Sequence, residues 1–513
     1  MPHPIASPSA PAHRALLSIA VMLTTIMVVL HMTIVNVALP HMMGALGATS
    51  EQVTWVLTSY LVSDAIFVSL TGFLAARFGQ RRLILLCIGG FVASSALCGL
   101  AQSLPEMVVL RILQGSLGAP IIPLSQAVMV ESFGREERGK AMAVWGIGIM
   151  VAPVLGPTLG GYITDHMDWR WVFYINVPVG IVSMLLALRT VRETARRALR
   201  TDWLGMGLMI AGIGSLQLVL DRGDQEDWFN SDLILVLTLI CVLGLTTFVL
   251  RGWRKPDNIV NLALFRDRNF ATTALMMGAF GLGLFGTIAI QPILLERLLG
   301  YPAALTGEVM APRALASAAG MFIVGQLITR IDPRYLVLTG IGLSTLGTWI
   351  MAGYTLDISP GWIVGPGIVQ GLGMGMIFVP LSTLAYDTLP RELAAEAAGL
   401  FNLVRTVGSS IGISIVATVL TRRTQHHWDV LGGYINPFNP DLQNWLTARG
   451  LSLDDPLAAQ QLAGELNRQA GMLAFVDTFW LVTWSFVLMA PLVWLLRRPA
   501  QAAKSSAGAL AGH

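Results

Sequence analysis

Charged residues are scarce in this chain. Only 12% of its 513 residues are Asp, Glu, Lys or Arg, whereas 54% are hydrophobic. A soluble globular protein carries about 25% charged residues. So large an apolar share cannot be hidden from water inside a soluble core. The composition therefore excludes an ordinary water-soluble protein and makes lipid the expected solvent.

Several chemical signatures are also missing. The three cysteines, Cys87, Cys98 and Cys241, stand inside apolar runs without disulfide or zinc spacing, so we expect packed free thiols. The chain has no Gly-x-x-x-x-Gly-Lys-Ser/Thr loop, which argues against transport driven by ATP on this chain alone. It has no metal-ligand cluster or nucleophile motif, and its net charge of +3 gives no reason to expect nucleic acid. We therefore expect neither an enzyme nor a bound cofactor.

The sequence does contain many apolar runs long enough to cross a membrane. About 20 apolar residues span the hydrocarbon as a helix, and we count fourteen such runs. The first is too long for a signal-peptide core, so we expect it to be retained as a span. The runs lie near 15–38, 53–74, 83–102, 106–130, 140–163, 170–190, 203–220, 231–251, 270–295, 306–329, 334–354, 361–385, 398–421 and 476–496.

Positive charge is concentrated in alternate loops between these runs. Arginine and lysine gather at 77–82, 135–140 and 189–200, whereas the loop at 221–230 is acidic. Loops rich in Lys and Arg stay in the cytoplasm. We therefore predict that both termini are cytoplasmic.

A short repeat divides the chain into two related halves. Gln114-Gly115 is followed by Pro123-Leu-Ser, and Gln370-Gly371 is followed by Pro380-Leu-Ser. Repeats of this kind are typical of transporters built from two bundles. We predict an all-α membrane protein with two six-helix bundles and an inserted helix pair. The predicted parts are a tail at 1–14, a first bundle at 15–190, the inserted pair at 191–252, spans 9–13 at 253–421, an outer loop at 422–475, the last span at 476–497 and a tail at 498–513.

Residues 146–161 are apolar but rich in glycine and proline. Proline bends a helix because it lacks an N–H and its ring presses on the preceding turn. Glycine leaves a flat face on which a neighbouring helix packs closely. We therefore predict a bent, closely packed helix that acts as a moving part. The residues concerned are Gly146, Gly148, Pro153, Gly156, Pro157, Gly160 and Gly161.

Three ionisable residues lie at comparable depths inside the first predicted bundle. They are His31, Asp64 and Arg111. Such groups cost about 2.5–3.5 kcal/mol to insert into a membrane and are functional by default. Counting residues along the helices makes a cluster of the three possible, in which Asp64 binds a proton, Arg111 sets its affinity and His31 tunes or relays. The alternatives are that Arg111 only joins helices, Asp64 only hydrogen-bonds a neighbour and His31 only lines a cavity.

Two arginines in the second half of the chain are expected to have structural roles. Arg313 and Glu308 lie one to two helical turns apart, so we expect them to pair. Arg405 is expected to anchor the cytoplasmic half of the second bundle.

Motifs spread along nearly the whole chain resemble those of one family. They are Thr33-Ile-Val-Asn-Val-Ala-Leu-Pro40, Gly72-Phe-Leu-Ala-Ala-Arg-Phe-Gly79-Gln-Arg-Arg82, Arg111-Ile-Leu-Gln-Gly115, Gly156-Pro-x-x-Gly-Gly161, Trp169-Arg-Trp-Val-Phe-Tyr-Ile-Asn-Val-Pro178, Leu264-Phe-Arg-Asp-Arg-Asn-Phe270 and Asn436-Pro-Phe-Asn-Pro440. The chain resembles the fourteen-span drug:proton antiporter branch of the major facilitator superfamily. Within it, the chain is similar to bacterial inner-membrane exporters that work with a periplasmic adaptor and an outer-membrane channel. The resemblance implies a major facilitator fold and alternating access, with proton entry driving drug exit.

The chain departs from that branch at two positions. The branch usually has an acid in span 1 just before the Thr-Ile-Val-Asn stretch, where this chain reads Leu30-His31-Met32, and an Asp where it has Ala76. Whether His31 replaces the usual acid in coupling stays open.

Further residues are assigned roles by the same interpretation. Gly72, Arg77, Gly79 and Arg81 are predicted to form a cytoplasmic gate, the alternative for the arginines being ordinary positive-inside anchoring. Asn36 and Gln114 are predicted polar points in the substrate cavity. In the loop 422–475, Trp428, Phe438 and Trp445 are predicted to contact the adaptor, the alternative being a solvated, self-packed loop.

The expected function is therefore proton-driven export of hydrophobic toxic compounds from the inner membrane. One alternative is export of a specific metabolite such as a siderophore. The other is a membrane receptor or scaffold that no longer transports.

Overall fold

The computed structural model describes residues 11–194, 196–197, 201–254 and 259–497, which form helices and no strand. The first bundle is built from the helices up to residue 190, and the last helix of the bundle packs against the first. Its elements are α1 (Pro11–Leu46), α2 (Ser50–Val53), α3 (Trp55–Phe78), α4 (Gln80–Leu100), α5 (Leu104–Gly118), α6 (Ile121–Ser132), α7 (Arg135–His166), α8 (Trp171–Tyr174) and α9 (Asn176–Thr190).

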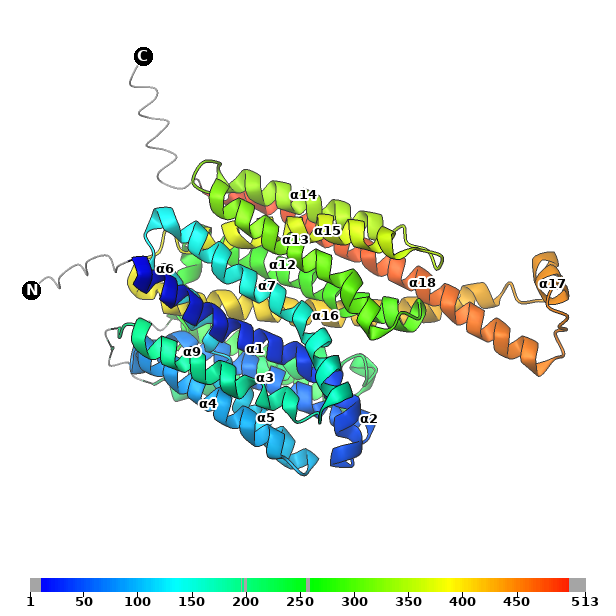
Figure 1. Cartoon of the computed structure of the whole chain (residues 1–513), viewed down its shortest axis with the longest axis horizontal. Coiled ribbons are helices and arrows are strands. Elements are labelled where there is room, and N and C mark those ends of the chain that lie inside the picture. Colours follow the sequence, from blue (N-terminus) through cyan, green and yellow to red (C-terminus); the bar gives the residue numbers. More distant parts are fainter. Residues whose placement is uncertain (1–10, 195, 198–200, 255–258, 498–513) are drawn as a thin grey trace, which may run out of the picture.

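The second bundle follows a helical hairpin of α10 (Trp203–Arg222) and α11 (Asp232–Arg254), and α10 attaches this hairpin to α3. The second bundle lies beside the first in Figure 1, where its helices run from green to orange. Its elements are α12 (Arg268–Ile293), α13 (Ala303–Leu327), α14 (Pro333–Met351), α15 (Pro360–Leu384), α16 (Ala394–Gly432), α17 (Pro440–Thr447) and α18 (Pro456–Met489).

The count of spans is lower than the sequence suggests. Among the described residues, 11 helices are long and apolar enough to cross a membrane, or up to 12 if the bent α7 is one span. Two further helices pack within the second bundle, α13 with 25 residues and α14 with 19, but they are not among these candidates. Charged residues inside them, such as Arg313 and Arg334, make both more polar. The count of fourteen stays a prediction.

Helix α7 shows the predicted bend. Its parts Glu136–Pro153 and Thr158–His166 meet at 44°. The glycines around the bend allow close packing on both sides of the helix. A Cβ at Gly156 would lie 2.7 Å from Cβ of Thr33 in α1, and one at Gly146 would lie 3.0 Å from Sδ of Met321 in α13. Helix α7 is therefore packed against its own bundle and against the opposite one.

Two helix pairs form most of the interface between the bundles: α3 with α16, and α7 with α13. The short helix α6 adds a third contact with α16. Because each pair joins one helix of each bundle, relative motion of the bundles must change these contacts.

Helices α16 and α18 extend well beyond the other helices, and α17 lies at the tip of this extension (Figure 1). The predicted loop 422–475 is thus largely helical, since α16 continues to Gly432 and α18 begins at Pro456. A small core at the tip contains Leu442, Leu446 and Ala458. Apolar residues at helical spacing in 440–447 and 456–466 make this core possible. We call residues 422–475 the hairpin extension.

The packing of α7 on α1 predicts unequal effects of two equivalent substitutions. Gly156→Ala places a methyl group against Thr33 and Ile34, whereas a Cβ at Gly161 meets nothing within 4 Å. We expect Gly156→Ala to lower the free energy of unfolding by about 1–3 kcal/mol. Gly161→Ala, the matched control, should be neutral or stabilising because alanine favours helix. Thermal unfolding in detergent measures both, and equal stability of the two variants would contradict the close packing.

Candidate functional site

A buried hydrogen-bond network occupies the interior of the first bundle around Arg111. Arg111 projects from α5 and is 1% exposed. Its Nη1 lies 2.7 Å from Nε2 of His31 on α1 and donates to Oε1 of Gln114 at 2.7 Å. Its Nε donates to the backbone oxygen of Val56 on α3 at 2.9 Å. Three helices are thus joined by one guanidinium.

Aromatic rings and an amide complete the surroundings of this network. The guanidinium carbon of Arg111 lies 4.2 Å from the centre of the Tyr60 ring, a cation–π geometry. The His31 ring packs edge-on against Phe91, with 5.4 Å between ring centres. Nδ1 of His31 lies 2.9 Å from the side-chain amide of Asn176 on α9. Both ring nitrogens of His31 therefore have polar partners.

The contact with Arg111 fixes the protonation of His31. A guanidinium has five N–H donors and no acceptor, so Nε2 of His31 must accept from it. The single proton of a neutral imidazole ring then sits on Nδ1, the nitrogen that faces the side-chain amide of Asn176. A second proton on the ring would remove the hydrogen bond and place two cations 2.7 Å apart. His31 is thus a neutral anchor for Arg111 while this contact holds.

Asp64 is not part of this network. It is 6% exposed on α3 and makes no hydrogen bond or ion pair with any residue that the structure describes. Tyr60, one helical turn away on α3, lies against the Arg111 guanidinium instead. The charge that acts on Asp64 is Arg405, on α16 of the opposite bundle. The structure therefore brings His31 and Arg111 together and directs Asp64 elsewhere.

The second bundle has a buried arginine of its own, which differs from the expected pairing. Nη1 of Arg313 donates to Oε1 of Gln291 at 2.9 Å, and Nη2 lies 3.5 Å from Sδ of Met374. No ion pair joins Arg313 to Glu308, although the structure describes both residues. Arg313 packs beside Gly367, whose Cβ would lie 3.7 Å from that of Arg313. In the repeat, Gly367 occupies the position of Arg111, so a neighbouring helix supplies the arginine that the repeat lacks here.

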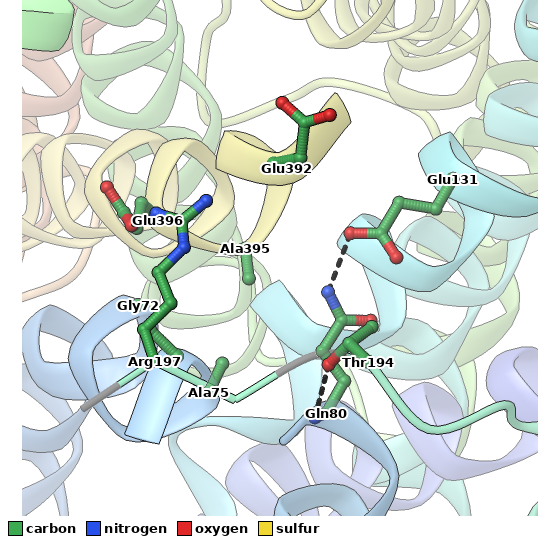
Figure 2. Close-up of a pocket in the computed structure, with 10 residues that line it drawn as sticks. Gly72, Ala75, Gln80, Glu131, Thr194, Arg197, Glu392, Ala395 and Glu396 are labelled. Atoms are coloured by element: carbon green, nitrogen blue, oxygen red, sulfur yellow. Dashed lines mark hydrogen bonds and ion pairs between the residues drawn. The ribbon is translucent and has the colours of Figure 1, made fainter. Parts of the chain in front are cut away.

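A pocket of about 270 Å³ lies between the bundles at the end of α3. On one side, Nη1 of Arg197 forms an ion pair with Oε1 of Glu396 at 3.3 Å. On the other side, Nε2 of Gln80 donates to Oε1 of Glu131 at 2.6 Å (Figure 2). Asn261, just before α12, also donates to Glu396, at 2.9 Å. We call the contacts of Glu396 with Arg197 and Asn261 the inner latch.

The predicted gate residues surround this pocket, but with other partners than expected. Arg77 donates to Oγ1 of Thr201 at 2.6 Å, and Arg81 donates to the backbone oxygen of Leu188 at 2.7 Å. Neither reaches the second bundle in these contacts, whereas Arg197 does. Sequence reasoning placed Arg197 among ordinary cytoplasmic charges because its loop carries no motif.

Gly72 and Gly79 have clear steric roles at the same end. A Cβ at Gly72 would lie 2.7 Å from Cα of Glu396, so α3 and α16 touch there backbone to backbone. Gly79 joins α3 to α4 with φ +85°, a conformation that favours glycine. Further out along α16, Asn402 donates to Oε1 of Gln126 on α6 at 2.6 Å. The bundles are thus held together at this end by close backbones and polar contacts.

The two residues predicted to line the cavity have different surroundings. Gln114 is completely buried and holds Arg111, so it belongs to the interior of the first bundle. Asn36 is exposed on α1 and has no hydrogen bond with the described part of the chain.

The predicted adaptor residues lie on the hairpin extension. Phe438 is 92% exposed and Trp428 is 43% exposed. Trp445 instead packs on the small tip core and stacks with Arg449, whose guanidinium carbon lies 4.1 Å from the ring centre. Phe438 and Trp428 are therefore available for contact, and Trp445 serves the local fold.

Comparison with known proteins places this arrangement in a family. A model described as Major Facilitator Superfamily matches residues 21–413. The chain belongs to this superfamily. It is 36% identical over 505 residues to the multidrug export protein EmrB of Escherichia coli K12, covering 97% of this chain and 98% of that protein. It is 35% identical over 494 residues to the fatty acid resistance protein FarB of Neisseria gonorrhoeae, covering 95% and 97%.

Solved structures show the same fold at low identity. A proton:xylose symporter superposes with a TM-score of 0.62 at 14% identity, covering 95% of this chain and 96% of its own. The human organic anion transporter MFSD10 gives 0.60 at 14%, covering 94% and 100%. These findings confirm the predicted family and the helical major facilitator fold of a multi-pass membrane protein.

The geometry at His31 predicts which substitutions the first bundle tolerates. His31→Leu removes an acceptor from the buried Arg111 guanidinium, and we expect a loss of about 1.5–3 kcal/mol in stability. His31→Gln keeps an acceptor in reach and should lose less than half of that. Thermal unfolding of both variants in detergent measures the difference. Equal losses would show that the Arg111–His31 contact is not what matters at this position.

Proposed function

We propose that this protein is a proton-driven multidrug exporter of the bacterial inner membrane, with both termini cytoplasmic. The observation that carries the proposal is one ionisable acid, Asp64, buried at the interface of two bundles of the major facilitator fold. The similarity to a multidrug export protein along almost the whole chain supports the direction and the breadth of transport. The proton gradient is the energy source.

Asp64 is the proton carrier in this proposal. It is the only carboxylate among the buried side chains that the structure describes. Placing an ionised carboxylate inside a membrane is costly, and the cost falls when it binds a proton. His31 does not take this part, because its hydrogen bond from Arg111 keeps it neutral. Arg111 is a fixed charge that joins three helices.

Alternating access requires the inner end to open. Opening must break the inner latch and the Asn402–Gln126 hydrogen bond, and it must separate α3 from α16 at Gly72. The latch and the Asn402–Gln126 hydrogen bond are polar, so water can take the place of either partner when the pocket floods. The pocket beside them is the route by which water enters first.

The buried charges favour one class of hydrophobic substrate over another. Four arginines are buried in the described structure, Arg111, Arg138, Arg313 and Arg405, against the single acid Asp64. An excess of buried positive charge attracts amphipathic acids and repels lipophilic cations. The name of the related fatty acid resistance protein agrees with this order. We therefore propose that acidic compounds are exported more readily than cationic ones.

The hairpin extension is the proposed contact with a periplasmic adaptor, which in turn reaches an outer-membrane channel. It projects beyond the bundles, has its own small core and exposes Trp428 and Phe438 at separate positions. A folded, projecting element with exposed aromatic side chains suits a protein interface.

Transport in proteoliposomes tests the proton carrier. With a pH gradient imposed, we expect efflux of an acidic fluorescent compound to exceed that of a cationic dye. Asp64→Asn should abolish gradient-driven movement because it cannot bind a proton. Asp221→Asn is the matched control, since Asp221 lies at the end of α10 and hydrogen-bonds Thr58. Full gradient-driven efflux by Asp64→Asn would refute its assignment as carrier.

Separating transport from resistance tests the adaptor contact. We expect replacement of 434–455 by a short flexible linker to leave efflux from proteoliposomes within about twofold of the wild type. The same variant should fail to protect cells, because export past the outer membrane needs the adaptor. Phe438→Ser, which leaves the small core intact, should show a weaker form of the same split. Unchanged resistance in cells would reject this surface as the docking site.

A further inference from the structure

Helices α3 and α16 cross the bundle interface in opposite directions and touch at their inner ends. A Cβ at Gly72 would lie 2.7 Å from Cα of Glu396, and one at Gly399 would lie 3.2 Å from the backbone nitrogen of Gly72. The same Cβ at Gly399 would lie 3.5 Å from the backbone oxygen of Val68. These contacts fix the register of one helix against the other.

From this contact the register places Asp64 and Arg405 at the same depth. Asp64 is eight residues from Gly72, and Arg405 is nine residues from Glu396. At 1.5 Å per residue, both lie about 12–14 Å further out along their helices. One side chain belongs to the first bundle and the other to the second.

Neither side chain has a hydrogen bond or ion pair with the residues that the structure describes. Arg405 is 9% exposed, and its Nε has no hydrogen-bond acceptor in the described structure. No ion pair joins it to Asp64 in this conformation, although the two interact electrostatically. The other group that acts on Arg405 is the buried Tyr386, a neutral phenol whose backbone oxygen accepts from Arg138. A buried guanidinium and a buried carboxylate without a partner are each costly. A conformation of the bundles in which the two side chains meet would lower that cost.

The other charged groups around α3 lie at other levels or have partners. Arg111 on α5 is engaged with His31 and with the ring of Tyr60. On α10, Asp221 and Arg222 contact Thr58 and Thr54, near the outer end of α3. Glu396 is held in the inner latch. Arg405 is the cation left for Asp64.

We propose that Arg405 is the counter-charge of Asp64: the two pair across the bundle interface when Asp64 is ionised, and proton binding to Asp64 releases Arg405. Proton occupancy thereby changes the attraction between the bundles at mid-depth. The role rests on the proposed proton-driven export and makes Arg405 the residue that couples the proton to motion. Arg111, by contrast, is tied into its own bundle in a network that does not include Asp64.

The test measures protonation of Asp64 directly, without transport. In the full-length protein in detergent, the infrared carbonyl band of protonated Asp64 is identified by its absence in Asp64→Asn and followed against pH. Removing the positive charge in Arg405→Gln makes the proton bind more tightly, so the midpoint should move to higher pH by about one unit or more. Arg405→Lys keeps the charge and should shift the midpoint by less.

Arg313→Gln is the matched control. It removes another buried arginine of the second bundle, one whose partners are the neutral Gln291 and Met374. Its midpoint should equal that of the wild type. An unchanged midpoint in Arg405→Gln, or an equal shift in Arg313→Gln, would overturn the proposal.

A stability measurement covers the case in which Arg405→Gln folds poorly. If the two charges stabilise each other, Arg405→Gln should destabilise the wild type more than it destabilises Asp64→Asn. Equal effects in both backgrounds would count against the pair.

Transport measured in parallel separates this proposal from the proposed function. If Asp64→Asn transports normally while the infrared midpoint still follows Arg405, the charge pair stands and the proton-driven function falls. If transport needs Asp64 but its midpoint ignores Arg405, the function stands and the coupling role of Arg405 falls.

Discussion

The structure depends on how it keeps a few charges inside an apolar protein. An ionised side chain away from water is stable only if hydrogen bonds or an opposite charge replace its hydration. Arg111 meets this condition with neutral acceptors from α1, α3 and α5. Because those contacts require His31 and Gln114 at fixed positions, the guanidinium ties α1, α3 and α5 to one another.

Asp64 and Arg405 fail the same condition in this conformation, and that failure has a functional meaning. Each lies buried on the helix pair that joins the bundles, two to three helical turns from the backbone contact at Gly72. Rearranging the hydrogen-bonded network of Arg111 would raise the free energy. Bringing two unpaired opposite charges together by a movement of their helices would lower it. Rigidity within each bundle and instability between them are what alternating access requires.

The two ends of the molecule differ in how their helices are held. At the inner end, Gly72 lets α3 and α16 touch, and the inner latch adds polar contacts that water can replace. At the other end, α16 and α18 continue past the bundles and form a hairpin with its own small core. One helix, α16, runs through both regions and carries Glu396, Arg405 and Trp428. Motion at the interface is thus mechanically connected to the projecting hairpin.

The sequence by itself determined the membrane environment, the two-bundle helical fold and the bend of α7, and it put His31, Asp64 and Arg111 at comparable depths. Composition, proline and glycine are local signals, and counting along a helix gives depth. Rotation about the helix axis is not encoded locally, because the apolar faces of a buried helix look alike. Only the tertiary structure decided that Asp64 stays outside the Arg111 network, on a helix that packs against α16 with its Arg405, and that Gln114 is an interior contact. The same holds for Arg197, whose role depends on Glu396, about 200 residues away in the chain, which packing alone brings within reach.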